Sequence, residues 1–313
     1  MNEFTLWEPA LQPDILGGED SFGNIEWTYP ELIQQIYEPL RQQYPDYITQ
    51  RSIGFDTSGE YEMWAYEFTP EHYTKTVYLQ SGVHVIETDA YFGLARLLYL
   101  IAHRADPRLQ VIRDTVRLLV VPVVSVWGIS KRGSYEEIMD TNRYRFPHNA
   151  AGVNANRDYQ DRKAAKTTNV FRYIGQYAED ICFAIDCHST TDTVLGAYLL
   201  PYSNDMPPHI AEKLKSINAA LYRKHPTPIP QRFMGEEKDY PVPNLMNTYN
   251  DGITKEFGIW ALTTEHNDYI YDDRLGTQKA MTLSVELLGN HLLQIVQDDD
   301  FTALSANARK VRK

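Results

Sequence analysis

The spacing of hydrophobic residues along the chain predicts an alternation of helices and strands. In the segment 27–45, apolar side chains such as Leu32 and Ile36 recur at the spacing of one helical face. A second segment of this kind follows Thr88, a residue type able to cap the start of a helix. The same pattern predicts helices at residues 27–45, 88–103, 166–180, 209–224 and 277–297.

Strands are expected between these helices. Residues 47–55 and 61–68 flank a Ser58-Gly59 turn and are typical of a β-hairpin. The nearly unbroken apolar run VRLLVVPVV at 116–124 is typical of a strand buried on both faces of a largely parallel sheet, and we expect the sheet to end near Pro122. Further strands are expected at 76–80, 181–186 and 259–264. This alternation predicts an α/β fold, a three-layer α/β/α sandwich around a mostly parallel mixed sheet.

The composition is that of a globular protein. Of the 313 residues, 43% are hydrophobic and 23% are charged, which argues against a disordered or fibrous chain. No internal repeat, low-complexity tract or long linker divides the sequence. We therefore expect a single catalytic domain over residues 1–313, with its core at about 27–296.

Net charge and apolar content exclude several classes of partner. The formal charge of −12 disfavours non-specific binding to nucleic acid or to anionic lipid. No apolar run approaches the roughly 20 residues of a membrane span, and the first residues lack the pattern of a secretory signal. Cys182 and Cys187 would point to opposite faces of one strand and could not pair. We expect a cytoplasmic protein in a reduced environment.

Reactive side chains follow three of the predicted strands. In open α/β sheets, ligands bind beyond the carboxyl ends of the strands, so these side chains are expected to converge. The residues in question are His84 and Glu87 after the strand 76–80, His188 after 181–186, and Glu265 after 259–264. Two imidazoles and one carboxylate with an open fourth position form a catalytic zinc site, and a further glutamate can serve as general base. The pattern alone leaves open which glutamate has which role.

Simpler interpretations exist for each of these residues. A lone H-x-x-E occurs often by chance, and a single histidine after a strand is more often a core or turn residue. The convergence of three strand ends is what favours a metal site.

A segment at 141–160 also contains Arg143, Arg145 and Arg157, which could pair with a carboxylate or stabilise an oxyanion. Taken singly, each arginine is more often part of a solvated loop.

Four short motifs occur in the order GVHVIE, GVNANRDY, IDCHS and LTTE, and they resemble those of the zinc carboxypeptidase family of carboxypeptidases A and B. The resemblance covers about residues 27–296. It implies that one Zn²⁺ ion per chain is bound by His84, Glu87 and His188, and that Glu265 is the general base. It also implies that Asn156 and Arg157 hold the terminal carboxylate of a peptide or peptide-like substrate.

The resemblance implies two further roles. An arginine should polarise the scissile carbonyl, and by spacing Arg145 fits this role better than Arg143. A tyrosine from the loop before the last strand should cap the substrate; Tyr249 is the candidate, with Tyr240 a weaker one. In the stretch 244–257, Asp251 or Lys255 could meet a charged substrate, although either could also face water.

Three departures from the family pattern predict an unusual cleft. Ile86 stands where the family often has arginine, and Thr190 replaces an aromatic residue after H-S. Asn154 replaces the aspartate that orients a zinc-binding histidine, and its oxygen could still accept the imidazole N–H, without charge. Hydrolysis of a cell-wall peptide or of a γ-linked acidic residue is therefore as compatible with the sequence as ordinary C-terminal trimming.

The motifs leave two alternatives to a zinc carboxypeptidase. A zinc amidohydrolase acting on an N-acyl amino acid, similar to succinylglutamate desuccinylases and aspartoacylases, would share the H-x-x-E and N-R elements. Those enzymes typically have a different segment around the catalytic glutamate. A non-catalytic protein that retains the fold would not need to keep all four of His84, Glu87, His188 and Glu265. The strand-borne TTE and the nearly full-length fit favour the carboxypeptidase.

Overall fold

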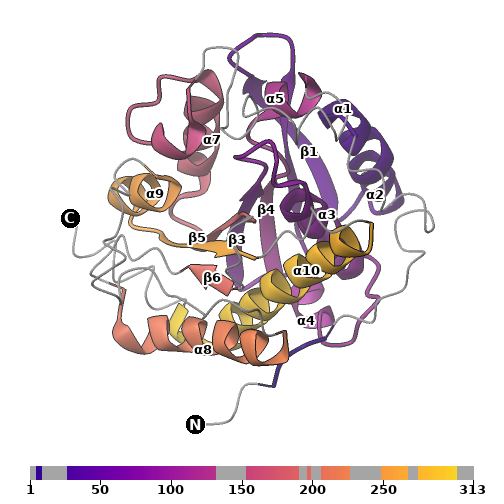
Figure 1. The fold of residues 1–313 in the computed structure, drawn as a ribbon, viewed down its shortest axis with the longest axis vertical. Helices are drawn as coiled ribbons and strands as arrows, with labels where there is room; N and C mark the ends of the chain where they lie inside the picture. The colour runs from indigo at the N-terminus through magenta and orange to yellow at the C-terminus, as the bar shows by residue number, and fades with distance from the viewer. Residues whose placement is uncertain are drawn as a thin grey trace.

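A mixed β-sheet runs through the centre of the molecule (Figure 1). The computed structural model describes residues 5–8, 27–131, 153–189, 196–198, 206–225, 248–266 and 274–301. Within these residues, seven strands are arranged in the order β1-β2-β4-β3-β5-β7-β6. The strands are β1 (Ile48–Phe55), β2 (Glu62–Phe68), β3 (Lys75–Ser81), β4 (Val116–Val121), β5 (Ile181–Cys187), β6 (Gly196–Tyr198) and β7 (Trp260–Glu265).

The middle of the sheet is parallel and its edges are antiparallel. Strands β4, β3, β5 and β7 run parallel to one another, whereas β1, β2 and β6 pair antiparallel with their neighbours. Every residue of β3 and β5 is buried, as expected for strands covered on both faces. Strand β4 ends at Val121, directly before Pro122, which confirms the predicted end of this strand.

Helices cover both faces of the sheet. On one side, α3 packs on β3 and β5 and also against α10, which in turn contacts α4 and α8; on the other side lie α7 and α9 (Figure 1). The helical elements are α1 (Tyr29–Leu32), η2 (Ile33–Tyr37), α2 (Glu38–Gln43), α3 (Thr88–Ala102), α4 (Gln110–Thr115), α5 (Val126–Lys131), η3 (Ala155–Arg157), α7 (Ala165–Tyr177), α8 (Pro208–Lys224), α9 (Tyr249–Phe257) and α10 (Arg274–Gln297). The predicted three-layer α/β/α sandwich is confirmed.

The first helix differs from its prediction because it contains a π-helical turn. Pro39 has no N–H to donate to the carbonyl four residues earlier, so the regular ladder cannot continue there. The helix widens just before this proline, where the N–H of Glu38 reaches the carbonyl of Ile33. Thr88 is also not a cap: α3 begins at Thr88, and Glu87 occupies the N-cap position without a capping hydrogen bond from its side chain.

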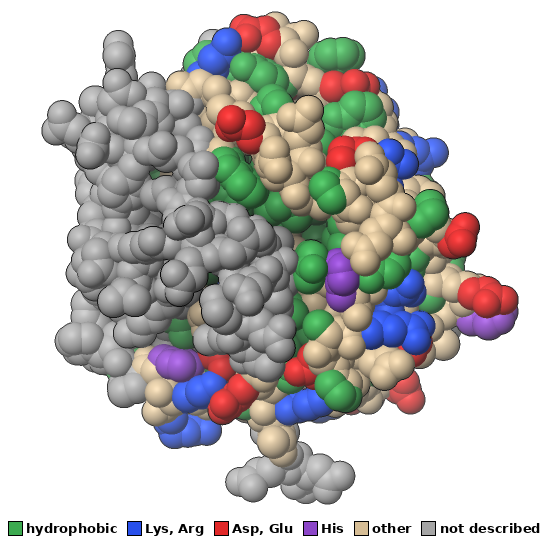
Figure 2. All heavy atoms as spheres, turned by 90° about the vertical axis from the view of Figure 1, so that its right-hand side faces the viewer, with side chains coloured by type: hydrophobic (Ala, Val, Ile, Leu, Met, Phe, Trp, Pro, Cys, Tyr) green, Lys and Arg blue, Asp and Glu red, His purple; other side chains and the backbone are tan. Residues whose placement is uncertain are grey.

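The cysteines are unpaired, and the charged side chains are spread over the surface. Cys182 and Cys187 are both buried and free, as their odd spacing in one strand predicted. In the part of the chain that the structure describes, no helix is both long and apolar enough to cross a membrane. Figure 2 shows one face of the molecule, on which acidic and basic side chains are interspersed among the coloured atoms.

Candidate metal centre and active site

Three neighbouring strand ends carry the reactive side chains. Strands β3, β5 and β7 are adjacent in the sheet, and their last residues are in register: Ser81 pairs with Cys187, and Cys187 pairs with Thr264. The N–H of His188 continues this register by donating to the carbonyl of Thr264 at 2.8 Å. The residues that follow the three strands are therefore brought to one edge of the sheet, as predicted.

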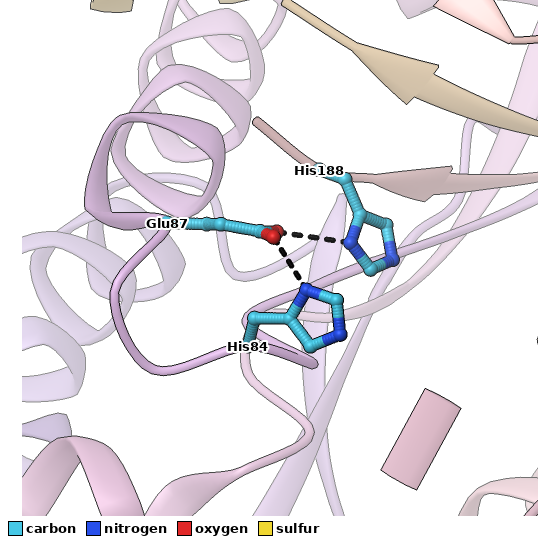
Figure 3. A group of neighbouring side chains, drawn as sticks. All are labelled: His84, Glu87 and His188. Atoms are coloured by element: carbon cyan, nitrogen blue, oxygen red, sulfur yellow. Dashed lines mark hydrogen bonds and ion pairs between the residues drawn. The ribbon is translucent and has the colours of Figure 1, made fainter. Parts of the chain in front are cut away.

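His84, Glu87 and His188 face one another (Figure 3). The Nδ1 atom of His84 contacts one carboxylate oxygen of Glu87, and Nδ1 of His188 lies 2.9 Å from the other. The two imidazole rings meet edge to face, with centroids 4.7 Å apart. One potential ligand atom from each of the three residues lies within 4.8 Å of the others. The cluster thus gathers two nitrogens and one oxygen around a single point.

These three residues fit a zinc ion. Two imidazole nitrogens and one carboxylate are the ligand set of many catalytic zinc sites. The Nδ1 atom of His188 is buried and has no well-aligned hydrogen bond, although it lies near Glu87. A buried polar atom of this kind is destabilising unless it finds a partner, and a bound metal would provide one. The side chain of His84 keeps 23% exposure, so the cluster opens to solvent on that side.

The charges of the cluster suit a cation. Burial by itself raises the pKa of Glu87, but the adjacent His84 and His188 lower it to about 2, so the carboxylate is ionised at neutral pH. Burial lowers the pKa of His188, yet Asp186 and Glu87 outweigh this and raise that pKa well above its usual value. A metal ion that binds His188 must therefore displace a proton.

Glu265 ends β7 beside this cluster. Burial raises the pKa of Glu265 well above its usual value, and the nearby Glu87 and Asp186 raise it further, while His188 opposes them. Its Oε2 atom is buried and has no hydrogen-bond partner within the described residues. A carboxyl group with a raised pKa and one oxygen without a hydrogen bond has the properties of a general base and acid.

A buried carboxylate links the residues next to the cluster, and no motif in the sequence points to it. Asp89 lies in the first turn of α3 and is fully buried. The Oγ atom of Ser189 donates to Asp89 at 2.8 Å, and Nε2 of His266 contacts its other oxygen. Ser189 directly follows His188, and His266 directly follows Glu265. Asp89 thus ties together the segments that carry a metal ligand and the candidate base.

The loop before His84 is held by the segment between β4 and α5 and by α7. The N–H of Ser125 donates to the carbonyl of Gly82, and its Oγ donates to the carbonyl of Val83 at 2.6 Å. Gly82 has a φ of 61°, a left-handed conformation that favours glycine. Behind Ser125, Nζ of Lys166 donates to its Oγ at 2.8 Å. This buried lysine therefore supports the loop that presents the first metal ligand.

We expect the variant Lys166→Met to be more stable than the wild type at pH 6. Burial lowers the pKa of Lys166 to about 7, although Asp158 and Asp56 partly oppose this. The unfolded chain binds this proton more strongly between pH 7 and 10.5, so wild-type stability rises with pH across that window. At about 1.4 kcal/mol per pKa unit, removing the charged lysine should raise the free energy of unfolding at pH 6 by a few kcal/mol. The lost hydrogen bond to Ser125 reduces this gain by about 1 kcal/mol.

Urea unfolding at pH 6 and pH 9 measures this difference. The advantage of Lys166→Met should shrink at the higher pH, where the wild-type penalty is fading. Lys163→Met removes an exposed lysine from the same segment and serves as the matched control. A Lys166→Met protein that is equally destabilised at both pH values would contradict the interpretation.

The predicted substrate-binding residues lie in and around η3. The side chain of Asn154 accepts the N–H of Asn156 at 2.8 Å and so caps this short helix. The guanidinium of Arg157 is exposed, and its Nη1 donates to the carbonyl of Asn156 at 2.6 Å. The binding of a carboxylate by Asn156 and Arg157 stays a prediction.

The other predicted residues have different surroundings. Tyr249 is the first residue of α9 and is 1% exposed, with its ring stacked on Tyr78 and edge-on to Tyr159. Its role in capping the substrate stays a prediction. Asp251 is buried and forms an ion pair with Lys255 at 2.5 Å, so the two candidate charges engage each other. Arg143, Arg145, Thr190 and Tyr240 lie outside the described residues.

Comparisons with known proteins agree with the fold and identify the family. A model of the zinc carboxypeptidase family matches residues 33–298. A metallo-carboxypeptidase from Burkholderia cenocepacia has a TM-score of 0.64 at 18% identity, over 86% of this chain and 69% of that chain. Bovine thrombin-activatable fibrinolysis inhibitor, solved in complex with tick carboxypeptidase inhibitor, has a TM-score of 0.61 at 14% identity. The match covers 86% of this chain and 99% of that chain.

A third similar structure is a metallo-carboxypeptidase from Pseudomonas aeruginosa in complex with (2-guanidinoethylmercapto)succinic acid. It has a TM-score of 0.58 at 13% identity, over 83% of this chain and 68% of that chain. At these identities, the structural similarity establishes the fold alone. The search of curated proteins by sequence finds no match.

Proposed function

The chain belongs to the zinc carboxypeptidase family, and we propose that it removes the C-terminal residue from a peptide or peptide-like substrate with a free carboxylate. The family is zinc-dependent and acts on peptides, so the chain is a metallocarboxypeptidase. The observation that carries the proposal is the convergence of His84, Glu87 and His188 beside Glu265, at the ends of three adjacent strands. The match over most of the chain supports one catalytic domain.

The proposed chemistry divides between the metal ligands and Glu265. A zinc ion held by His84, Glu87 and His188 supplies a Lewis acid, which polarises a carbonyl and lowers the pKa of water. Glu265 accepts the proton of the attacking water and then donates it to the leaving nitrogen. Its raised pKa and its unpartnered buried oxygen support this role.

The proposed substrate contacts come from the segment before β5. Asn156 and Arg157 bind the terminal carboxylate, because a guanidinium forms paired hydrogen bonds with a carboxylate. The exposed position of the Arg157 guanidinium, close in sequence to Asn156, supports this assignment. Arg145 stabilises the developing oxyanion, a role that rests on its place in the sequence motif.

We expect cleavage to require a free C-terminus. Two peptides of identical sequence, one ending in a carboxylate and one in an amide, are incubated with the zinc-loaded protein and followed by mass spectrometry. The free acid should lose its last residue, and the amide should remain intact because it offers Arg157 no charge. Equal cleavage of both peptides, or cleavage at internal bonds, would contradict the proposal.

The variant Arg157→Ala tests the assigned residue in the same assay. A hydrogen bond to a charged group contributes about 1.5–3 kcal/mol, so KM for the free acid should rise by roughly 10–100-fold. The zinc content should stay the same, and Arg157→Lys should restore part of the binding because it keeps the charge. An unchanged KM for Arg157→Ala would show that the carboxylate is bound elsewhere.

A further inference from the structure

A buried carboxylate lies directly behind His188. Asp186 is the penultimate residue of β5 and is fully buried. It precedes His188 by two residues, so in an extended chain both side chains project to the same face. Its Oδ2 atom lies 2.8 Å from Nε2 of His188. Asp186 therefore contacts the nitrogen on the opposite side of the ring from the metal cluster.

This contact determines which nitrogen of His188 can bind a metal. A carboxylate oxygen accepts hydrogen bonds, so the contact with Asp186 favours the form of His188 that carries its hydrogen on Nε2. In the neutral ring, Nδ1 then has a free lone pair. This Nδ1 atom is the one that faces Glu87 and lacks a well-aligned hydrogen bond. Asp186 thus selects the tautomer that the metal centre requires.

The carboxylate should also stabilise the metal-bound state more than the metal-free state. Within the described residues, His188 is the side chain that hydrogen-bonds to Asp186, and the other oxygen of Asp186 has no partner. A cation on Nδ1 draws electron density from the ring and makes its N–H a stronger donor, which compensates Asp186. Such partners of metal-binding histidines typically change metal affinity by about 10–100-fold.

Asn154 was the residue expected to orient a metal-binding histidine. Its Oδ1 atom instead accepts the N–H of Asn156 and caps η3. A carboxylate on the other metal-binding histidine, His188, is provided by Asp186. We propose that Asp186 is a positioning residue, which orients His188 and strengthens metal binding, so that the orienting oxygen comes from β5 and not from residue 154. This inference rests on the proposed function only in requiring that zinc binds at His188.

The test is the variant Asp186→Asn in the full chain. Asparagine keeps the size of the side chain and an oxygen that can accept the N–H, but it removes the charge. The zinc dissociation constant is measured by competition with a chelator, and the melting temperature is measured with and without zinc. We expect zinc affinity to fall by about 10–100-fold. The rise in melting temperature that zinc causes should be smaller in the variant than in the wild type, because the metal is bound less tightly.

This combination separates positioning from a structural role. If Asp186 only supported the fold, the metal-free protein would melt at a lower temperature and zinc affinity would be unchanged, which would overturn the inference. Asp158→Asn makes the same substitution at a buried carboxylate that accepts N–H groups of Lys163 and Ala164, and it should not change zinc affinity. Asn154→Ala should not change it either; a large loss there would return the role to residue 154.

Two further outcomes keep the inference separate from the proposed function. If the wild type binds zinc and Asp186→Asn binds it equally tightly, the inference fails while the proposed function stands. If the wild type does not bind zinc at all, both fail. Should Asp186→Asn not fold, Asp186→Ser, which is also uncharged, is measured in the same way with the same expected loss of affinity.

Discussion

The variant Glu265→Gln should lose turnover by about 10²–10⁴-fold while it still binds zinc as tightly as the wild type. Glutamine has nearly the same size as glutamate, but its amide cannot accept the proton of the attacking water. Glu265 lies beside the three metal ligands and is not one of them, so the ion should stay in place. The two effects together distinguish a general base from a metal ligand.

Steady-state kinetics on one peptide and the zinc content of the same preparation measure both effects. Glu256→Gln makes the same substitution at an exposed glutamate of α9 and should leave turnover unchanged. If Glu265→Gln kept near-normal turnover, Glu265 would be a structural residue and the proposed mechanism would be wrong. If it lost its zinc, Glu265 would belong to the metal ligands.

The variant His188→Ala should have the largest effect on the metal itself. It removes one of three donors from a fully buried position, and it leaves the carboxylates of Glu87 and Asp186 without the imidazole between them. The loss of zinc affinity should exceed the roughly 10–100-fold typical of losing a residue that only supports a ligand. Peptide hydrolysis should fall to background at the zinc concentrations that saturate the wild type.

Zinc retained after dialysis, measured by mass spectrometry of the metal, gives the affinity change. Circular dichroism shows whether the variant is folded. His103→Ala removes a partly exposed histidine at the end of α3 and is the matched control. Wild-type zinc affinity in a folded His188→Ala protein would mean that the metal is bound elsewhere.

The sequence predicted the metal centre because strong local patterns place its residues. The apolar runs of β3, β5 and β7 are recognisable by themselves, and each is followed at once by a reactive side chain. Parallel strands in one sheet align their carboxyl ends, so the convergence of His84, His188 and Glu265 follows from fold class alone. The adjacency of these three strands in the sheet was not predictable from periodicity.

The supporting contacts could not be predicted because they join residues far apart in the sequence. Asp89 and His266 are 177 positions apart, and nothing in either segment indicates that the two side chains meet. Asp186 belongs to the motif IDCHS, but which nitrogen of His188 it contacts depends on the folded geometry. The oxygen of Asn154 could have accepted the N–H of a histidine, but it accepts the backbone N–H of Asn156.

Helix α9 shows a further limit of local patterns. Its sequence YNDGITKEF is polar and contains a glycine, which weakens the helical signal. In the fold, a Cβ atom on Gly252 would lie 2.6 Å from the ring of Phe171, so tertiary packing requires glycine there. The same helix begins at Tyr249, which explains why the tyrosine expected on a loop lies in the core.

The zinc stoichiometry of the wild-type chain tests the proposed metal centre most directly. The purified protein is stripped with a chelator, dialysed against zinc at neutral pH, and analysed for bound metal. We expect one zinc ion per chain, and a variant lacking the side chains of His84, Glu87 and His188 should retain none. A wild-type chain that binds no zinc, or a triple variant that binds one ion as tightly as the wild type, would contradict the proposed metal centre.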